Sequence, residues 1–252
     1  MTDRSNRSVD RAFTIVDELA ESGSVRVSEL ADRLEMPVST TYDYLQALTS
    51  TGYVIKEGNH YRTTTRFLEV GYRQLHREEV FKQVDEELDT IAEETGEHVT
   101  LMIEEDGMGV LVAIREGEQA VDLFAYPGAR MPLHATAPGK ALLAYMPDER
   151  VDEILDQRGL PALTNQTITD QSVLRDQLED IRERGYAVDE GERIVGMVLV
   201  AAPILDKRNR VQAAICVGGP QSRFGETRRT EIADVVQRAA NVTQVRLDYK
   251  FR

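Results

Sequence analysis

Apolar residues recur at helical spacing over the first 50 residues and then follow strand spacing, which predicts three helices followed by a β-hairpin. The first helix is expected over residues 8–21, and Gly23 ends it. Its apolar face would complete a three-helix core and consists of Val9, Ala12, Phe13, Val16 and Leu19.

Residues 28–62 predict two short helices, a turn and the hairpin. Pro37 separates the two helices, Ser39 is expected to cap the second helix, and Gly52 to end it in a left-handed conformation. One stripe of the second helix would be buried, formed by Thr41, Tyr44, Leu45 and Leu48. This arrangement is a winged helix-turn-helix, whose second helix enters the major groove of DNA.

The exposed face of that second helix and the hairpin form the predicted DNA-binding surface. The face carries hydroxyls, an amide and an aromatic ring, where a solvated face usually carries Glu and Lys. The predicted contacts are Ser39, Thr40, Tyr42, Asp43 and Gln46 on the helix, His60, Tyr61 and Arg62 on the hairpin, and Arg11 on the first helix. A glutamine suits adenine, and an aspartate can accept from the N4 of cytosine.

Two alternatives stay open for this segment. Arg11 could reach a phosphate or a dimer partner, or it could simply be solvated. Because only Arg62 and Arg66 supply positive charge close by, a small helical bundle that binds no nucleic acid is also compatible with the pattern.

The rest of the chain predicts a linker helix and an α+β domain. Residues 67–97 keep a helical period without proline, and Asp106-Gly107 then joins two strands in a hairpin. Further strands are expected at 122–126, 195–205 and 211–217, and helices at 138–145, 172–184 and 225–249. The fold class is α+β, an antiparallel sheet flanked by helices. The expected domains are the winged helix-turn-helix over 1–66, the linker helix over 67–96 and an effector-binding domain over 97–252.

Composition indicates the kind of host and the cellular compartment in which the chain works. The 252 residues carry 44 acidic and 30 basic side chains, a net charge of −14, and most basic residues are arginine. An acidic, lysine-poor surface favours a salt-loving host. No apolar run is long enough to span a membrane, and the N-terminus does not resemble a signal peptide. The single cysteine, Cys216, excludes an internal disulfide and fits a reducing cytoplasm.

Motifs of enzymes, metal sites and cofactors are missing from the sequence. The run APGK at 137–140 lacks the first glycine and the final Ser or Thr of a phosphate-binding loop. The four histidines are scattered, no G-x-S-x-G motif occurs, and Cys216 lies in an apolar run typical of a buried thiol. The sequence therefore predicts no enzyme, no metal and no cofactor.

Three segments rich in small residues could form a ligand site. They are 133–140, which enters a helix, 185–192, which carries three carboxylates, and 218–220, which ends a strand. The free N–H groups at a helix start suit an anion. Tight turns explain the same residues equally well.

Several motifs resemble the IclR-type transcriptional regulators. In the N-terminal half, VSELADRLEMPVSTTYDYLQALTSTGYV resembles their DNA-binding segment. In the C-terminal half, PLHATAPGKALLAY, TNQTITDQSVLRDQLEDIRERGYAVDEGE, GMVLVAAPILD and AAICVGGPQSRF resemble their other signatures, in the same order. The resemblance runs from about residue 8 to 239. It implies a cytoplasmic regulator of catabolic genes, which binds operator DNA as a dimer or dimer of dimers and a small effector in a GAF-like domain.

The resemblance also implies the residues of the effector site. They are Ala135, Thr136, Ala137, Pro138 and Gly139 at the helix start, with Asp189, Leu199, Cys216 and Gly218. This chain departs from the family pattern at Leu199, where a cysteine is common, and at Cys216 and Gly218, where two serines can line the pocket. These losses of polar partners favour a larger effector than a two- or three-carbon oxo acid, such as a sugar acid or an aromatic acid.

In the recognition helix, Tyr42-Asp43 replaces the family's His-Arg. A protein-interaction module with a vestigial helix-turn-helix is the alternative function.

Overall fold

The structure, a computed structural model, describes residues 6–121 and 125–250. The chain divides into an N-terminal unit, Met1–Arg77, and a C-terminal unit, Glu78–Arg252. The elements of the N-terminal unit are α1 Arg7–Ser22, β1 Val25–Arg26, α2 Val27–Arg33, α3 Val38–Ser50, β2 Val54–Glu57, β3 His60–Thr63 and α4 Arg66–Leu75. Those of the C-terminal unit are α5 Glu79–Thr95, β4 His98–Glu105, β5 Met108–Glu116, β6 Arg130–Pro132, η1 Leu133–Ala135, α6 Ala137–Ala144, α7 Asp148–Arg158, α8 Gln171–Arg184, β7 Ala187–Glu190, β8 Met197–Leu205, β9 Val211–Pro220, η2 Gln221–Arg223 and α9 Glu226–Lys250.

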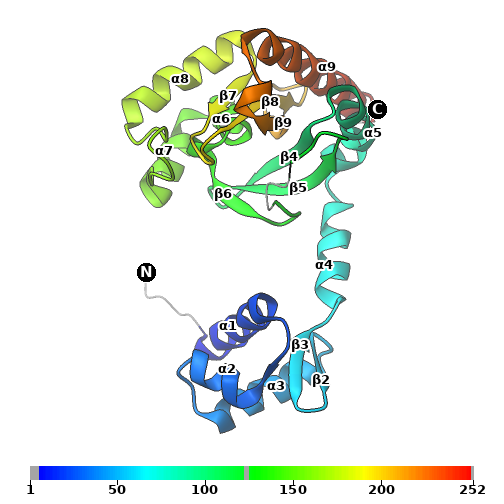
Figure 1. The fold of residues 1–252 in the computed structure, drawn as a ribbon, viewed down its shortest axis with the longest axis vertical. Coiled ribbons are helices and arrows are strands. Elements are labelled where there is room, and N and C mark those ends of the chain that lie inside the picture. The colour runs from blue at the N-terminus through cyan, green and yellow to red at the C-terminus, as the bar shows by residue number, and fades with distance from the viewer. Residues whose placement is uncertain (1–5, 122–124, 251–252) are drawn as a thin grey trace. The chain divides into compact units, whose positions relative to one another are not determined.

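The N-terminal unit is a winged helix-turn-helix, as predicted. Helices α1, α2 and α3 pack beside a small sheet in the strand order β1-β3-β2, with antiparallel pairs (Figure 1). Gly52 adopts a left-handed φ of 79° just after α3, which confirms its expected role. The core of the unit consists of Ile15, Leu19, Val25, Leu30, Leu45, Val54 and Tyr61.

Two details of this unit differ from the prediction. Ser39 lies inside α3 and makes no cap, because the helix begins one residue earlier and Pro37 occupies its N-cap position. On α1 the buried face is rotated toward Ile15, so Val9 and Phe13 are 49% and 59% exposed. An apolar period identifies the apolar face of a helix, but the neighbouring elements decide how much of that face is covered.

The helix expected over 67–97 is two helices. Helix α4 ends at Leu75 and α5 begins at Glu79, so the break falls at residues 76–78. No residue of α4 is buried. Helix α5 belongs to the C-terminal unit and buries one face, formed by Val80, Val84, Leu88, Ile91, Ala92 and Thr95.

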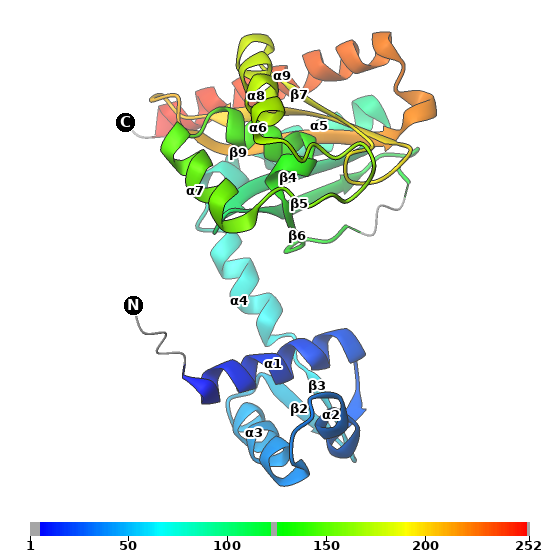
Figure 2. The ribbon, with the colours of Figure 1, turned by 90° about the vertical axis from the view of Figure 1, so that its left-hand side faces the viewer.

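The C-terminal unit contains a six-stranded antiparallel sheet in the order β6-β5-β4-β9-β8-β7, which confirms the predicted α+β class. Helix α6 packs on the central strands, with α8 against it, whereas α5 and α9 pack together and against the sheet (Figures 1 and 2). The β4–β5 hairpin turns at Asp106 and Gly107, both with positive φ, as expected of an Asp-Gly turn.

Other segments were assigned differently or not assigned from the sequence. Residues 187–190, part of the segment 185–192 that tight turns would also explain, form the edge strand β7, and α7 and β6 have no counterpart in the sequence prediction. The strand expected at 122–126 includes residues 122–124, which lie outside the described part of the chain. Among the described residues, no helix is both long and apolar enough to cross a membrane.

Candidate functional site

Helix α3 presents most of its predicted DNA contacts to solvent. Ser39, Asp43 and Gln46 are exposed, Tyr42 is 43% exposed, and Thr40 is half-buried. The opposite side of α3 buries Thr41 and Leu45, as predicted. The division follows from the 3.6-residue period of the helix, which turns successive side chains to different directions. The exposed face can donate and accept hydrogen bonds.

The wing, which is the β2–β3 hairpin, exposes fewer polar side chains than the sequence indicated. Tyr61 is 1% exposed and belongs to the core, so its ring is not free to contact DNA, which corrects its assignment. Alternation along β3 turns Tyr61 inward, whereas His60 and Arg62 are half-buried. The guanidinium of Arg62 is paired with Glu57. Arg11, on α1, is exposed.

The predicted effector residues on the sheet lie on one face. Register places Asp189 opposite Leu199, Leu199 opposite Gly218, and Gly218 opposite His98. Paired residues project to the same face, so these four form one row, and Cys216, two residues along β9, lies on that face as well. This is the face that packs against α6.

The start of α6 is a closed turn. The Oγ1 of Thr136 caps the helix by accepting a hydrogen bond from the N–H of Gly139 at 3.1 Å. A Cβ added to Gly139 would lie 2.1 Å from the carbonyl oxygen of Leu133, so this glycine allows two backbone segments to meet. The other predicted residues of this turn are buried, namely Ala135, Ala137 and Pro138.

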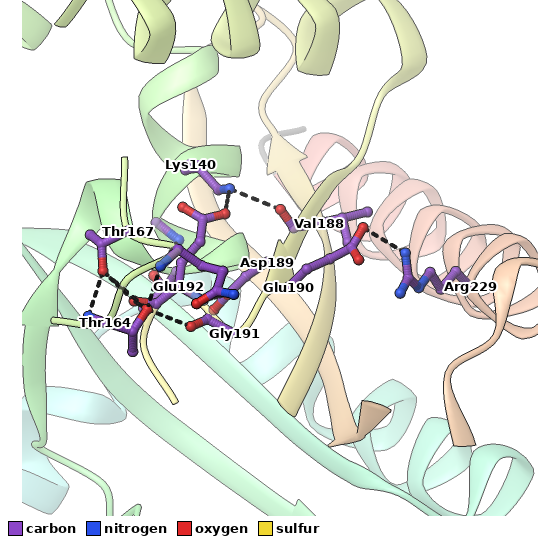
Figure 3. Close-up of polar contacts among 12 residues, drawn as sticks. Lys140, Thr164, Thr167, Val188, Asp189, Glu190, Gly191, Glu192 and Arg229 are labelled. Carbon is purple, nitrogen blue, oxygen red and sulfur yellow. Dashed lines mark hydrogen bonds and ion pairs between the residues drawn. The ribbon is translucent and has the colours of Figure 1, made fainter. Parts of the chain in front are cut away.

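Helix α6 carries one buried charge, Lys140, toward the edge strand β7. The Nζ of Lys140 is paired with Glu192 and donates to the carbonyl oxygen of Val188 at 2.9 Å (Figure 3). Thr164 and Thr167 hold the same segment, because their Oγ1 atoms donate to the carbonyl oxygens of Gly191 at 2.7 Å and Glu192 at 2.6 Å. Sequence reasoning missed this pairing. The sequence signal that could have indicated it is the lysine within the otherwise apolar helix α6.

Asp189 lies beside that pair and is fully buried. Its Oδ1 accepts the N–H of Glu192 at 2.7 Å. Its Oδ2 is buried and has no hydrogen-bond partner in the described part of the chain. Burial raises the pKa of Asp189 to about 7, against the hydrogen bond from Glu192, which lowers it. When the carboxyl is ionised, its Oδ2 is an unpaired acceptor that only a donor from elsewhere can satisfy.

Leu199 and Cys216 supply apolar side chains on this face. Leu199 fills the space above Gly218, since its Cγ lies 3.0 Å from where a Cβ of Gly218 would be. Cys216 is buried, and burial raises the pKa of its thiol far above the ordinary value, which confirms a core thiol and not a nucleophile. In residues 6–121 and 125–250, no cluster of His, Cys, Asp and Glu could hold a metal ion.

Residues 8–58 match the IclR helix-turn-helix domain, and residues 72–244 match the C-terminal domain of the bacterial transcriptional regulator IclR. The chain belongs to the IclR family. Its members are transcriptional regulators and not enzymes.

Individual members of the IclR family are similar over nearly the whole chain. The acetate operon repressor of Salmonella typhimurium is 32% identical over 239 residues, which cover 93% of this chain and 87% of the repressor. The crystal structure of IclR from Thermotoga maritima has a TM-score of 0.83 and 32% identity, covering 96% of this chain and 98% of that one. An IclR homologue from Microbacterium hydrocarbonoxydans, crystallised with 4-hydroxybenzoate, shares the fold at a TM-score of 0.78 and 22% identity, with 94% and 98% covered.

Proposed function

We propose that this IclR-family regulator binds operator DNA through α3 and the wing and changes that binding when a small metabolite occupies the C-terminal unit. The observation that carries the effector half of the proposal is the buried, unpartnered Oδ2 of Asp189. An unpaired buried acceptor costs free energy that a bound hydroxyl donor would recover. Operator DNA lies in the cytoplasm, so the regulator works there, and its net charge of −14 suits a host with concentrated salt.

On the DNA side, the exposed hydroxyls, amide and carboxylate of α3 supply base contacts. Tyr42, Asp43 and Gln46 lie on the solvent side of the helix, at spacings that share one face. The face carries no lysine or arginine, so affinity depends on base contacts and on the wing more than on phosphate neutralisation.

The DNA proposal is tested by changing Thr40→Ala together with Tyr42→Ala. We expect the double variant to lose about 2–6 kcal/mol of specific binding, at about 1–3 kcal/mol per good base contact. Retardation of promoter DNA by the full chain measures it. The control is Thr49→Ala, on the same helix but outside the predicted surface. Unchanged affinity of the double variant would refute the assignment, and absence of any DNA binding by the parent would favour the protein-interaction alternative.

On the effector side, the ligand is a hydroxy acid, such as a sugar acid or an aromatic acid. Asp189 would accept from a ligand hydroxyl, and Leu199 with Cys216 supplies an apolar wall in the GAF-like domain. The proposed site spans the turn 135–139, Asp189, Leu199 and the strand end at Cys216 and Gly218.

The protein is at least a dimer. A single winged helix contacts too few base pairs to select a site in a genome, and paired half-sites are the usual solution. The N-terminal unit exposes apolar side chains that a second copy would cover, namely Val9 and Phe13 on α1 and Leu68, Val70 and Tyr72 on α4.

A further inference from the structure

The loop between β7 and β8 carries an arginine with no ion-pair partner. Nine arginines of the described residues are half-buried, and eight of them are ion-paired: Arg62, Arg115, Arg150, Arg175, Arg223, Arg228, Arg229 and Arg246. The ninth is Arg193. Its guanidinium makes no ion pair or hydrogen bond with any residue in 6–121 or 125–250. Removing a guanidinium from water without a partner costs free energy, so this exception requires an explanation.

The carboxylates nearest in sequence are engaged elsewhere. Glu192 is paired with Lys140, Glu190 with Arg229 at 2.5 Å, and the Oδ1 of Asp189 accepts from a backbone N–H (Figure 3). Asp189 and Arg193 influence each other through space, since the negative charge of Asp189 raises the pKa of the guanidinium while burial, the larger effect, lowers it. No hydrogen bond or ion pair joins the two side chains.

The loop that bears Arg193 is held at both ends. Thr164 and Thr167 donate to the carbonyl oxygens of Gly191 and Glu192, and the carbonyl oxygen of Gly196 accepts from the N–H of Gln221 at 2.7 Å. A guanidinium on an anchored loop loses less conformational entropy when it binds a ligand than one on a free loop.

We propose that Arg193 binds the carboxylate of the effector while the Oδ2 of Asp189 accepts from a hydroxyl of the same molecule. Two observations meet here: an unpaired, half-buried cation, and an unpaired, fully buried acceptor four residues before it. A guanidinium binds a carboxylate through two parallel hydrogen bonds. The arrangement selects small hydroxy acids and rejects their neutral amides. It also moves the anion contact away from the start of α6, where the Gly139 N–H is already taken by Thr136.

This inference rests on the proposed effector site, and calorimetry on the full chain tests it. The probes are 4-hydroxybenzoate and D-gluconate, each beside its neutral amide, 4-hydroxybenzamide and D-gluconamide. We expect the parent to bind at least one acid, and to bind it more tightly than its amide. Arg193→Gln should weaken acid binding by about 10- to 100-fold, the range for a hydrogen bond to a charged group. Its affinity for the amide should not change.

Two further variants keep the test decisive. Arg193→Lys retains the charge but not the paired hydrogen bonds, so its affinity for the acid should lie between those of the parent and Arg193→Gln. It also serves if Arg193→Gln fails to fold. Arg208→Gln removes an exposed arginine from the turn between β8 and β9 and should bind as the parent does.

Three results would overturn the proposal: equal acid affinity of parent and Arg193→Gln, equal affinity of the parent for acid and amide, or binding of neither acid. Retardation of promoter DNA without any acid separates this from the proposed function. The parent and Arg193→Gln should bind DNA equally well. If the parent binds an acid but no DNA, the proposed DNA binding is contradicted, whereas the proposed role of Arg193 is not.

Discussion

The N-terminal unit is rich in exposed apolar side chains, whereas the C-terminal unit contains buried charged ones. Among the described residues, eight of the fourteen exposed large hydrophobic side chains belong to the N-terminal unit, although that unit is less than half the size of the other. Within residues 6–121 and 125–250, the buried charged side chains belong to the C-terminal unit: Glu97, Lys140, Asp189 and Glu192. The buried polar residue of the described part of the N-terminal unit is Thr41.

This contrast relates each unit to the size of its partner. Covering an exposed apolar side chain with a second large surface, such as DNA or another subunit, lowers the free energy. A buried charge contributes when its partners are arranged closely around it, as in a site that surrounds a small molecule. The exposed apolar side chains of the N-terminal unit therefore suit a macromolecular partner, and the buried charged side chains of the C-terminal unit suit a small molecule.

The largest expected effect comes from breaking the buried pair between Lys140 and Glu192. Lys140→Met leaves a carboxylate buried without its partner, so we expect a loss of about 3–5 kcal/mol in the free energy of unfolding. The exposed pair of Arg238 and Glu94 is the control, and Arg238→Met should cost less than about 1 kcal/mol. Urea unfolding of the full chain, followed by circular dichroism, measures both. Equal losses would remove the contrast between buried and exposed charge.

The second prediction concerns pH and Asp189. Its pKa is about 7 in the folded chain, above the ordinary 3.8, so the folded state holds a proton that the unfolded state has lost between pH 4 and 7. The contribution of Asp189 to the free energy of unfolding therefore falls as pH rises through this window, by up to about 4 kcal/mol. Asp189→Asn keeps the Oδ1 acceptor and removes the titration, so the variant should gain stability relative to the parent as pH rises.

Urea unfolding of parent and Asp189→Asn at pH 4, 5.5 and 8 measures the gap between them. Other titrating groups are common to both proteins, so they cancel in the comparison. A gap that does not change with pH would show that Asp189 titrates as an ordinary carboxyl.

The third prediction concerns the exposed apolar side chains of the N-terminal unit. Phe13 and Leu68 are 59% and 71% exposed, so Phe13→Ser and Leu68→Ser should change the free energy of unfolding of the monomer by less than about 0.5 kcal/mol. We expect these variants to lower the mass seen by light scattering at micromolar protein and high salt, because they remove the surface proposed for the dimer. Val173→Ser, at a similarly exposed site on α8, is the control and should leave the mass unchanged.

The smallest expected effect concerns the wing. Glu57 is paired with Arg62, and the hydrogen bond from Arg62 lowers the pKa of Glu57. Glu57→Gln should release the guanidinium for a phosphate, tighten promoter binding about two- to fivefold and raise the salt slope by about one. Glu69→Gln, which releases Arg73 on α4, should leave DNA binding unchanged. Weaker binding by Glu57→Gln would mean that the pair itself orders the wing.

Local patterns in the sequence determined most of the elements of both units. Helical period, the left-handed glycine at position 52 and the Asp106-Gly107 turn depend on residues within a few positions of one another. For that reason the winged helix-turn-helix and the α+β class could be predicted. Motifs in the right order also indicated the family. The break between α4 and α5 was not predicted, because residues 76–78 contain no proline or glycine.

Tertiary packing decided what each side chain does. Whether Phe13 or Ile15 is buried depends on which side of α1 its neighbours cover, and Tyr61 was placed in the core by the pairing of β3. Lys140 and Glu192 are 52 residues apart in the sequence, and no local pattern joins them. The lack of a partner for Arg193 becomes visible only when the partners of the carboxylates around it are known. A charge is free or paired according to residues that the fold brings to it, so only the tertiary structure could single out this arginine.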